Sequence, residues 1–170
     1  MLKVRLGYAD PPYPGQAKLY KDHPDYAGEV DHAALVERLR GYDGFVLHTS
    51  APALPMIQAL VPEARLCVWV KPFAAFKRNV PVAYAFEPVL IKSVRKPVVG
   101  GLVKPLRDYV AESITMKRGL TGAKPEKVCW WAFEVAGLTP DDEIDDIFPG
   151  SGAVSRAWGT WASQRLEVRK

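Results

Sequence analysis

The sequence has few cysteines and no long apolar run. Cys67 and Cys129 are the only cysteines in 170 residues, and neither has a Cys or His neighbour at the spacing of a metal site. We therefore expect two buried thiols in a reducing compartment and no metal centre. A membrane-spanning helix needs about 18 or more consecutive apolar residues, and none is present. Residues 1–15 lack the apolar core of a signal peptide, so we expect a cytoplasmic protein without membrane association.

Net charge is also low, because 23 basic and 19 acidic residues leave only +4. The charges are nevertheless uneven: nine Lys or Arg and three acids lie between Lys92 and Lys127, whereas five acids lie between Asp141 and Asp146. A basic segment of this kind is either a solvated surface or a contact for nucleic-acid phosphates. The candidate phosphate contacts are Arg95, Lys96, Lys104, Arg107, Lys117 and Arg118.

The hydrophobic pattern predicts alternating strands and helices in a single domain that spans residues 1–170. Strands are expected at 2–9, 44–49, 65–70, 84–92 and 143–148, and helices at 31–40, 52–60, 125–137 and 153–162. Ser50 is expected to cap the second helix, and Pro88 to place its strand at a sheet edge or a bulge. This alternation predicts an α/β fold with a mostly parallel sheet that has helices on both faces.

Two turns that follow predicted strands contain residue types suited to ligand binding. The first, Asp10–Tyr13, combines a carboxylate, two prolines that stiffen the loop and an aromatic ring. Such a loop either is a rigid surface turn or holds an amine, since Asp10 and the Pro11 carbonyl can accept its hydrogen bonds while Tyr13 stacks on a base. The second, Phe148–Gly152, joins a strand to a helix and either is a plain tight turn or brings a ligand to the helix N-terminus.

These segments resemble the motifs of a known family. Asp10-Pro11-Pro12-Tyr13 resembles the catalytic DPPY motif of the amino-group DNA methyltransferases. Asp146–Gly152 is similar to their DPFxGSG cofactor motif, with Ile147 in place of the usual proline, and Thr121–Pro125 resembles the Lys-Pro segment that borders the cofactor. The catalytic motif precedes the cofactor motif, which is similar to the circularly permuted β class of this family.

The resemblance implies a Rossmann-like methyltransferase fold and S-adenosyl-L-methionine as cofactor. The expected reaction is methylation of a nucleobase exocyclic amine, and the leading Asp favours N6 of adenine in DNA over cytosine. The implied catalytic residues are Asp10, Pro11, Pro12 and Tyr13. The implied cofactor-binding residues are Asp10, Thr121, Lys124, Pro125, Asp146, Phe148, Pro149, Gly150, Ser151 and Gly152.

The sequence departs from the family pattern near its end and in its size. Only 18 residues follow Gly152, and Glu167 is the sole acid in place of the one that usually binds the ribose. The family normally continues through at least one more strand, so the sheet here either lacks a strand or is completed by a partner copy in a homodimer. No separate target-recognition domain is evident. The alternatives are methylation of RNA or of a free nucleobase, or a non-catalytic subunit that binds nucleic acid. Outside the motifs, Lys71 and Glu87 are expected to form a structural ion pair.

The basic segment leads to a prediction about salt. If it provides the main contact with DNA, affinity should fall by roughly 0.9 log units per log unit of salt for each phosphate neutralised. Replacing Arg95, Lys96 and Arg107 together by alanine should then weaken binding to all sequences alike and flatten the salt dependence, because phosphate contacts do not distinguish bases. Filter-binding titrations at several salt concentrations measure both effects. A methylation site of six or more strictly required base pairs would contradict this view.

Overall fold

Six strands of the described chain form one sheet in the order β5-β3-β4-β2-β1-β6. The computed structural model describes residues 2–22, 28–73, 79–96, 105–114 and 123–168. The strands are β1 (Arg5–Ala9), β2 (Gly44–His48), β3 (Arg65–Val70), β4 (Phe86–Lys92), β5 (Tyr109–Ala111) and β6 (Glu143–Asp146). The pairs β1–β2, β1–β6 and β3–β5 are parallel, and only β4 runs antiparallel to its two neighbours. The prediction of a mostly parallel sheet is confirmed.

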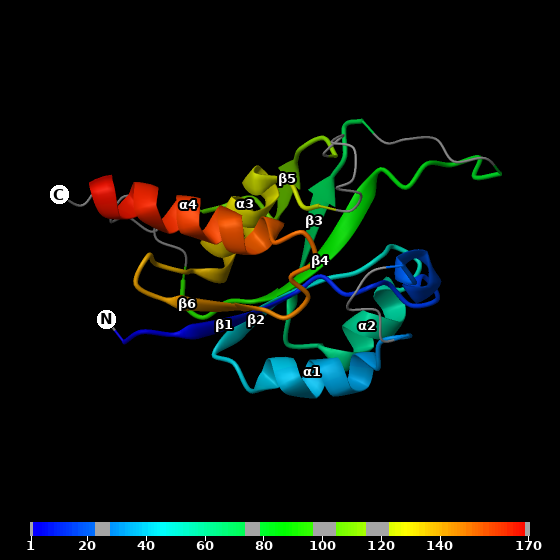
Figure 1. Ribbon diagram of the computed structural model, residues 1–170, viewed down its shortest axis with the longest axis horizontal. Helices are drawn as coiled ribbons and strands as arrows, with labels where there is room; N and C mark the ends of the chain where they lie inside the picture. The colour runs from blue at the N-terminus through cyan, green and yellow to red at the C-terminus, as the bar shows by residue number, and fades with distance from the viewer. Residues whose placement is uncertain (1, 23–27, 74–78, 97–104, 115–122, 169–170) are drawn as a thin grey trace.

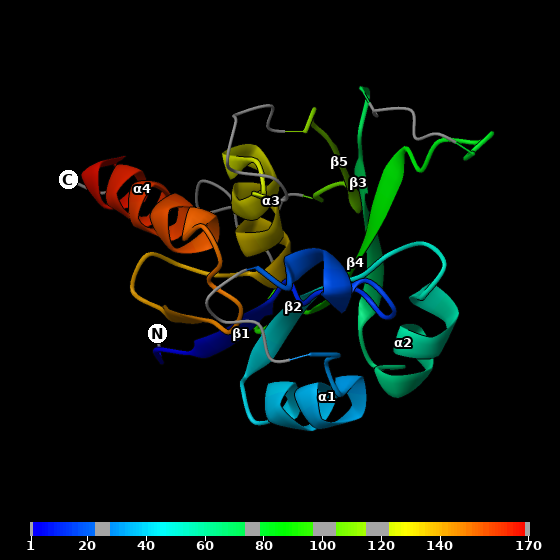
Figure 2. The same cartoon turned by 45° about the vertical axis from the view of Figure 1, so that its right-hand side comes forward.

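Helices cover both faces of this sheet, as Figures 1 and 2 show. On one face lie α1 (His32–Arg40) and α2 (Leu54–Leu60), and on the other lie α3 (Glu126–Ala136) and α4 (Ala153–Val168). A short 3-10 helix, η1 (Ala17–Tyr20), follows β1. No helix in the described part of the chain is both long and apolar enough to cross a membrane.

Two hydrophobic cores follow from the alternation of side chains along the strands. In β2, Phe45 and Leu47 pack into the cluster that includes Leu35 and Leu39 of α1. Val46 points to the opposite cluster, which is built on α3 and α4. Cys67 and Cys129 are both buried, as predicted. The tryptophans of α3 and α4 belong to the second cluster or pack against it, so they are core residues and not a surface for stacking bases.

The position of Pro88 was predicted wrongly, because β4 lies inside the sheet between β3 and β2. The last residue pair of the β2–β4 ladder is His48 with Val89, so Pro88 lies one residue beyond it. The Pro88 carbonyl accepts a hydrogen bond from the Thr49 amide, which shows that its backbone polar atoms face the end of β2. The missing N–H therefore costs no bond of that ladder, and an internal strand tolerates the proline.

Several boundaries also differ from the predicted ones. Helix α2 begins at Leu54 after Ala53, without a side-chain cap, so Ser50 is not its N-cap. Strand β6 ends at Asp146, two residues earlier than predicted, and β5 was not predicted. Helix α4 continues to Val168, which places Glu167 on an exposed helix surface.

A prediction for stability concerns Gly137, which ends α3 in a left-handed conformation with φ of 78°. A Cβ there would lie 2.2 Å from the Arg95 carbonyl oxygen, so the backbone must move. We expect Gly137→Ala to lower the free energy of unfolding by about 2 kcal/mol or more, since the clash adds to the backbone strain. Gly159→Ala is the matched control: it lies within α4 with nothing near its Cβ, and should stabilise by about 0.5–1 kcal/mol. Urea unfolding measures both, and equal effects would contradict the explanation.

Candidate active site

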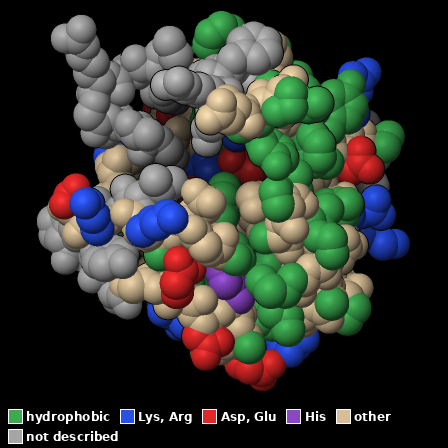
Figure 3. Space-filling view, turned by 90° about the vertical axis from the view of Figure 1, so that its right-hand side faces the viewer, with side chains coloured by type: hydrophobic (Ala, Val, Ile, Leu, Met, Phe, Trp, Pro, Cys, Tyr) green, Lys and Arg blue, Asp and Glu red, His purple; other side chains and the backbone are tan. Residues whose placement is uncertain are grey.

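Polar side chains from three strands converge at one edge of the sheet. Asp10 directly follows β1, and His48 ends the neighbouring parallel strand β2. Because β4 is antiparallel, its beginning lies at this same edge and contributes Glu87. Suitable ligand atoms of Asp10, His48 and Glu87 all lie within 4.8 Å of one another. Figure 3 shows acidic and basic side chains at the bottom of a hollow beside a largely hydrophobic surface.

Lys124 lies between these side chains, just before α3, and its side chain is only 6% exposed. Its ammonium Nζ lies 3.0 Å from Asp10 Oδ1 and 2.8 Å from Glu87 Oε1. A third, longer hydrogen bond of 3.4 Å goes to the Tyr13 hydroxyl. An ammonium group has three donors, so these three contacts satisfy it. Lys124 thus connects the end of β1, the loop after it and the beginning of β4.

Glu87 is buried and has ionic or hydrogen-bonded partners on three sides. Besides Lys124, it contacts His48 Nδ1 at 2.8 Å through Oε1 and Lys71 Nζ at 3.1 Å through Oε2. Burial by itself would raise the pKa of Glu87, but Lys124, His48 and Lys71 outweigh it and hold the pKa well below its usual value. The predicted ion pair of Lys71 with Glu87 is therefore present, and it is part of a larger network.

The network extends behind Glu87 to His48 and Tyr8, both fully buried. The Tyr8 hydroxyl lies 2.8 Å from His48 Nε2. Since the carboxylate of Glu87 only accepts hydrogen bonds, His48 Nδ1 carries a proton and donates it to Glu87, while Nε2 and the Tyr8 hydroxyl form a second hydrogen bond. Burial raises the pKa of Tyr8 well above its usual value, so its hydroxyl stays protonated.

Residue types alone would also suit a metal ion at Asp10, His48 and Glu87. The position between the two carboxylates already contains the Lys124 ammonium, which contacts both. Burial by itself would lower the pKa of Lys124, but Asp10 and Glu87 hold it well above its usual value. The chain therefore supplies a permanent cation at this position.

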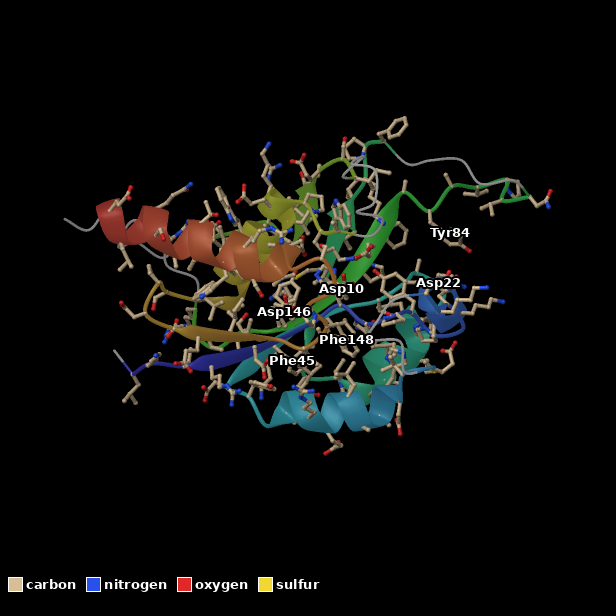
Figure 4. The ribbon with its side chains drawn as sticks, viewed as in Figure 1. Asp10, Asp22, Phe45, Tyr84, Asp146 and Phe148 are labelled. Atoms are coloured by element: carbon tan, nitrogen blue, oxygen red, sulfur yellow. The ribbon has the colours of Figure 1, made fainter. Side chains whose placement is uncertain are left out.

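A second feature of the same edge is the turn between β6 and α4. Gly150 and Gly152 have φ of 47° and 74°. A Cβ at Gly150 would lie 3.9 Å from the Phe148 carbonyl oxygen, and one at Gly152 would lie 3.0 Å from the end of the flexible Arg156 side chain. Asp146 ends β6 and accepts a hydrogen bond from the Ser155 hydroxyl through Oδ2, whereas Oδ1 is buried without a partner among the described residues. Burial raises the pKa of Asp146, and the nearby charge of Asp10 adds to this effect. Figure 4 labels Asp10, which directly follows β1, and Asp146, which ends the adjoining strand β6.

These observations bring together most of the predicted site residues. Asp10, Tyr13 and Lys124 are in direct contact, Pro11 and Pro12 join Asp10 to Tyr13, and Pro125 precedes α3. Pro149, Gly150, Ser151 and Gly152 form the turn before α4. Phe148 packs beside the core on the α1 face, and Thr121 lies outside the described residues.

The predicted nucleic-acid contacts fall into three groups. Lys96 and Arg107 are exposed. The Arg95 guanidinium, in contrast, is paired with both oxygens of Asp142 at 2.5 and 2.9 Å and donates to the Gly137 and Leu2 carbonyls. It joins the residue before β6 to the segment after β4, which is a structural role and not a phosphate contact, so replacing Lys96 and Arg107 alone tests the salt dependence. Lys104, Lys117 and Arg118 lie outside the described residues.

Solved structures that are similar to this chain include two of M1.HpyAVI. M1.HpyAVI as a complex with SAM has a TM-score of 0.62 and 20% identity, with 94% of this chain and 80% of that chain covered. Another crystal structure of M1.HpyAVI has a TM-score of 0.50 and 18% identity, with 97% and 88% covered. No family model and no curated protein matches the sequence. The chain thus has the Rossmann-like fold of S-adenosylmethionine-dependent methyltransferases.

Asp146 gives a prediction about pH. A carboxyl whose pKa is raised by folding destabilises the folded state once it ionises, so its contribution worsens as pH rises through the raised pKa. We expect Asp146→Asn to raise the urea midpoint at pH 7, and this gain should vanish at acidic pH, where Asp146 is protonated. Asp145→Asn is the control, because Asp145 is paired with Arg5, Arg38 and Tyr42 and its loss should destabilise. A lower midpoint for Asp146→Asn at pH 7 would contradict the argument.

Proposed function

We propose that this protein is an S-adenosylmethionine-dependent methyltransferase that acts on the exocyclic amine of a nucleobase, N6 of adenine in DNA. One observation carries the proposal: the buried Lys124 ammonium fixes Asp10 at 3.0 Å, next to Tyr13, on the sheet edge where the glycine turn before α4 also lies. A carboxylate acceptor, an aromatic ring and a helix N-terminus thus face one region. The similar fold of M1.HpyAVI, solved with SAM, supports the choice of cofactor.

The residues of the glycine turn fit this cofactor. Asp146 Oδ1 is a buried acceptor without a partner in the described chain, which suits the ammonium of a methionine group. The N-terminus of α4 offers the N–H groups at its start and the positive end of the helix dipole to a carboxylate. A side chain at Gly150 or Gly152 would narrow the space through which the cofactor reaches the N-terminus of α4. When bound, S-adenosylmethionine supplies an electrophilic methyl group.

The residues of the first turn suit the amine. Asp10 Oδ1 is held by Lys124, which leaves Oδ2 to accept a hydrogen bond from the amine. The Pro11 carbonyl accepts the second hydrogen, and the Tyr13 ring stacks on the base. These contacts aim the nitrogen lone pair and need no strong base, since the methylated ammonium is acidic enough to release its proton. Catalysis then consists of positioning and electrostatics.

Exposed cations on this chain support a nucleic-acid substrate. Lys96 and Arg107 follow β4 and precede β5, and the Arg107 guanidinium lies over the Tyr109 ring at 5.6 Å. Lys96 follows the end of β4 that lies opposite Glu87, so it suits the phosphates of a polymer that extends beyond the site. We also infer the permuted motif order of the β class. A homodimer and a cytoplasmic location belong to the same proposal.

Asp10→Ala tests the function. It should abolish methyl transfer, because the amine loses its acceptor, while cofactor affinity measured by calorimetry stays within several-fold. Mass spectrometry of nucleosides, from DNA and RNA incubated with the protein and isotopically labelled cofactor, identifies the methylated base and polymer. Near-normal turnover by the Asp10→Ala variant would remove Asp10 from the mechanism. A parent protein that binds the cofactor but labels neither polymer would contradict the proposed function.

A further inference from the structure

Glu87 belongs to none of the three motif segments, yet it determines where the Lys124 ammonium lies. Lys124 has two carboxylate partners, and the shorter contact, 2.8 Å, is to Glu87. The Glu87 side chain is 5% exposed and its position is fixed in turn by His48 and Lys71. Asp10 is more accessible, with 21% of its side chain exposed. Glu87 is therefore the carboxylate whose position is fixed by its buried partners. Asp10 contacts this buried part of the network through the Lys124 ammonium.

The charges of this network balance. Asp10 and Glu87 contribute two negative charges, and Lys71 and Lys124 contribute two positive ones. His48 links Glu87 to Tyr8 through hydrogen bonds of 2.8 Å from each of its ring nitrogens. Buried charges are tolerated when they are paired and hydrogen-bonded, so this balance lets the network exist beneath the sheet edge.

We propose that Glu87 is a positioning residue that keeps the Lys124 ammonium against Asp10, and that this fixed cation makes the site selective for uncharged amines. The inference rests on the proposed function and names the class of amine that the site accepts. Neutralised through Oδ1, Asp10 offers Oδ2 as a hydrogen-bond acceptor without a net negative charge to attract a cation. A protonated amine, such as a lysine side chain or a polyamine, would face the Lys124 ammonium across the same carboxylate.

The same geometry excludes Lys124 as a general base. Its neighbours are Asp10 after β1, Tyr13 in the following loop, Glu87 on β4 and Cys129 on α3. Lys71, which directly follows β3, lies beyond Glu87. The two carboxylates hold the pKa of Lys124 well above its usual value, although burial acts in the opposite direction. Lys124 thus stays protonated throughout the neutral range and cannot take a proton from the amine.

Glu87→Gln tests the positioning role, with Glu134→Gln as the matched control on the outer part of α3, where Glu134 is paired with Arg165. We expect Glu87→Gln to lower kcat at least tenfold with cofactor affinity within about threefold. The alkaline limit of activity should also move to lower pH, because Lys124 loses one of the carboxylates that keep it protonated. Nuclear magnetic resonance titration of the Lys124 Nζ measures the same shift without turnover. An unchanged pH profile and an unchanged Lys124 titration would overturn the role.

A charge-balanced double variant separates loss of the positioning role from loss of the folded structure. Glu87→Gln with Lys124→Met removes one charge of each sign, so it should fold even if the single variant does not. It should lose activity to a similar extent, since Asp10 is no longer held. Parent-like turnover by the folded double variant would overturn the proposal.

Selectivity is measured with two small aromatic amines in the presence of cofactor. Aniline is uncharged at pH 7, whereas benzylamine is protonated. We expect the parent to bind aniline in preference to benzylamine, by chemical-shift titration, and Lys124→Met to move this preference at least tenfold towards benzylamine. A parent that prefers benzylamine, or a preference that Lys124→Met does not change, would overturn the selectivity. A parent with these preferences that methylates no nucleic acid would instead contradict the proposed function, so the two failures are distinguishable.

Discussion

The burial of the Lys124 ammonium is the constraint on which the site depends. An ammonium removed from water is costly unless carboxylates surround it, and here two do so within 3.0 Å. One of these carboxylates, Glu87, is itself buried and needs His48 and Lys71, and His48 in turn needs the hydroxyl of Tyr8. Removing any member leaves another polar group without its partner. The buried residues of the network therefore determine where the more exposed Asp10 lies at the sheet edge.

Much of the fold was predictable because hydrophobic periodicity and breaker residues determine it locally. Gly137 ends α3 as expected, since only a residue without a Cβ fits beside the Arg95 backbone. The position of Pro88 was not predictable, because it depends on where β2 stops relative to β4. Strand β5 has three residues, and its pairing with β3 is tertiary information that a short sequence pattern does not contain.

The sequence predicted the motif residues of the site, but it did not predict the hydrogen bonds and ion pairs that connect them to Glu87, His48 and Tyr8. Asp10 and Tyr13 have a recognisable spacing, and their neighbour Lys124 was assigned to the cofactor, whereas its ammonium contacts Asp10, Tyr13 and Glu87. The sequence did indicate His48 and Glu87, because each is a polar residue in an otherwise apolar strand. Burying such a residue is unfavourable unless it has a hydrogen-bond or ionic partner. Tyr8 gave none, because a tyrosine in a buried strand is ordinary. Which polar residues pair depends on strand order, and that order emerges only in three dimensions.

The opposite direction of β4 has a consequence for how such a protein can diversify. Because β4 alone is reversed, the stretch that leads into it reaches the same edge as the stretches that leave β1, β2 and β6. Four connections that are far apart in the chain thus border one opening, while the strands behind them retain the pairing and the cores. Insertions in one connection can alter what enters the opening without disturbing the other three. The scaffold separates the evolution of selectivity from the maintenance of stability.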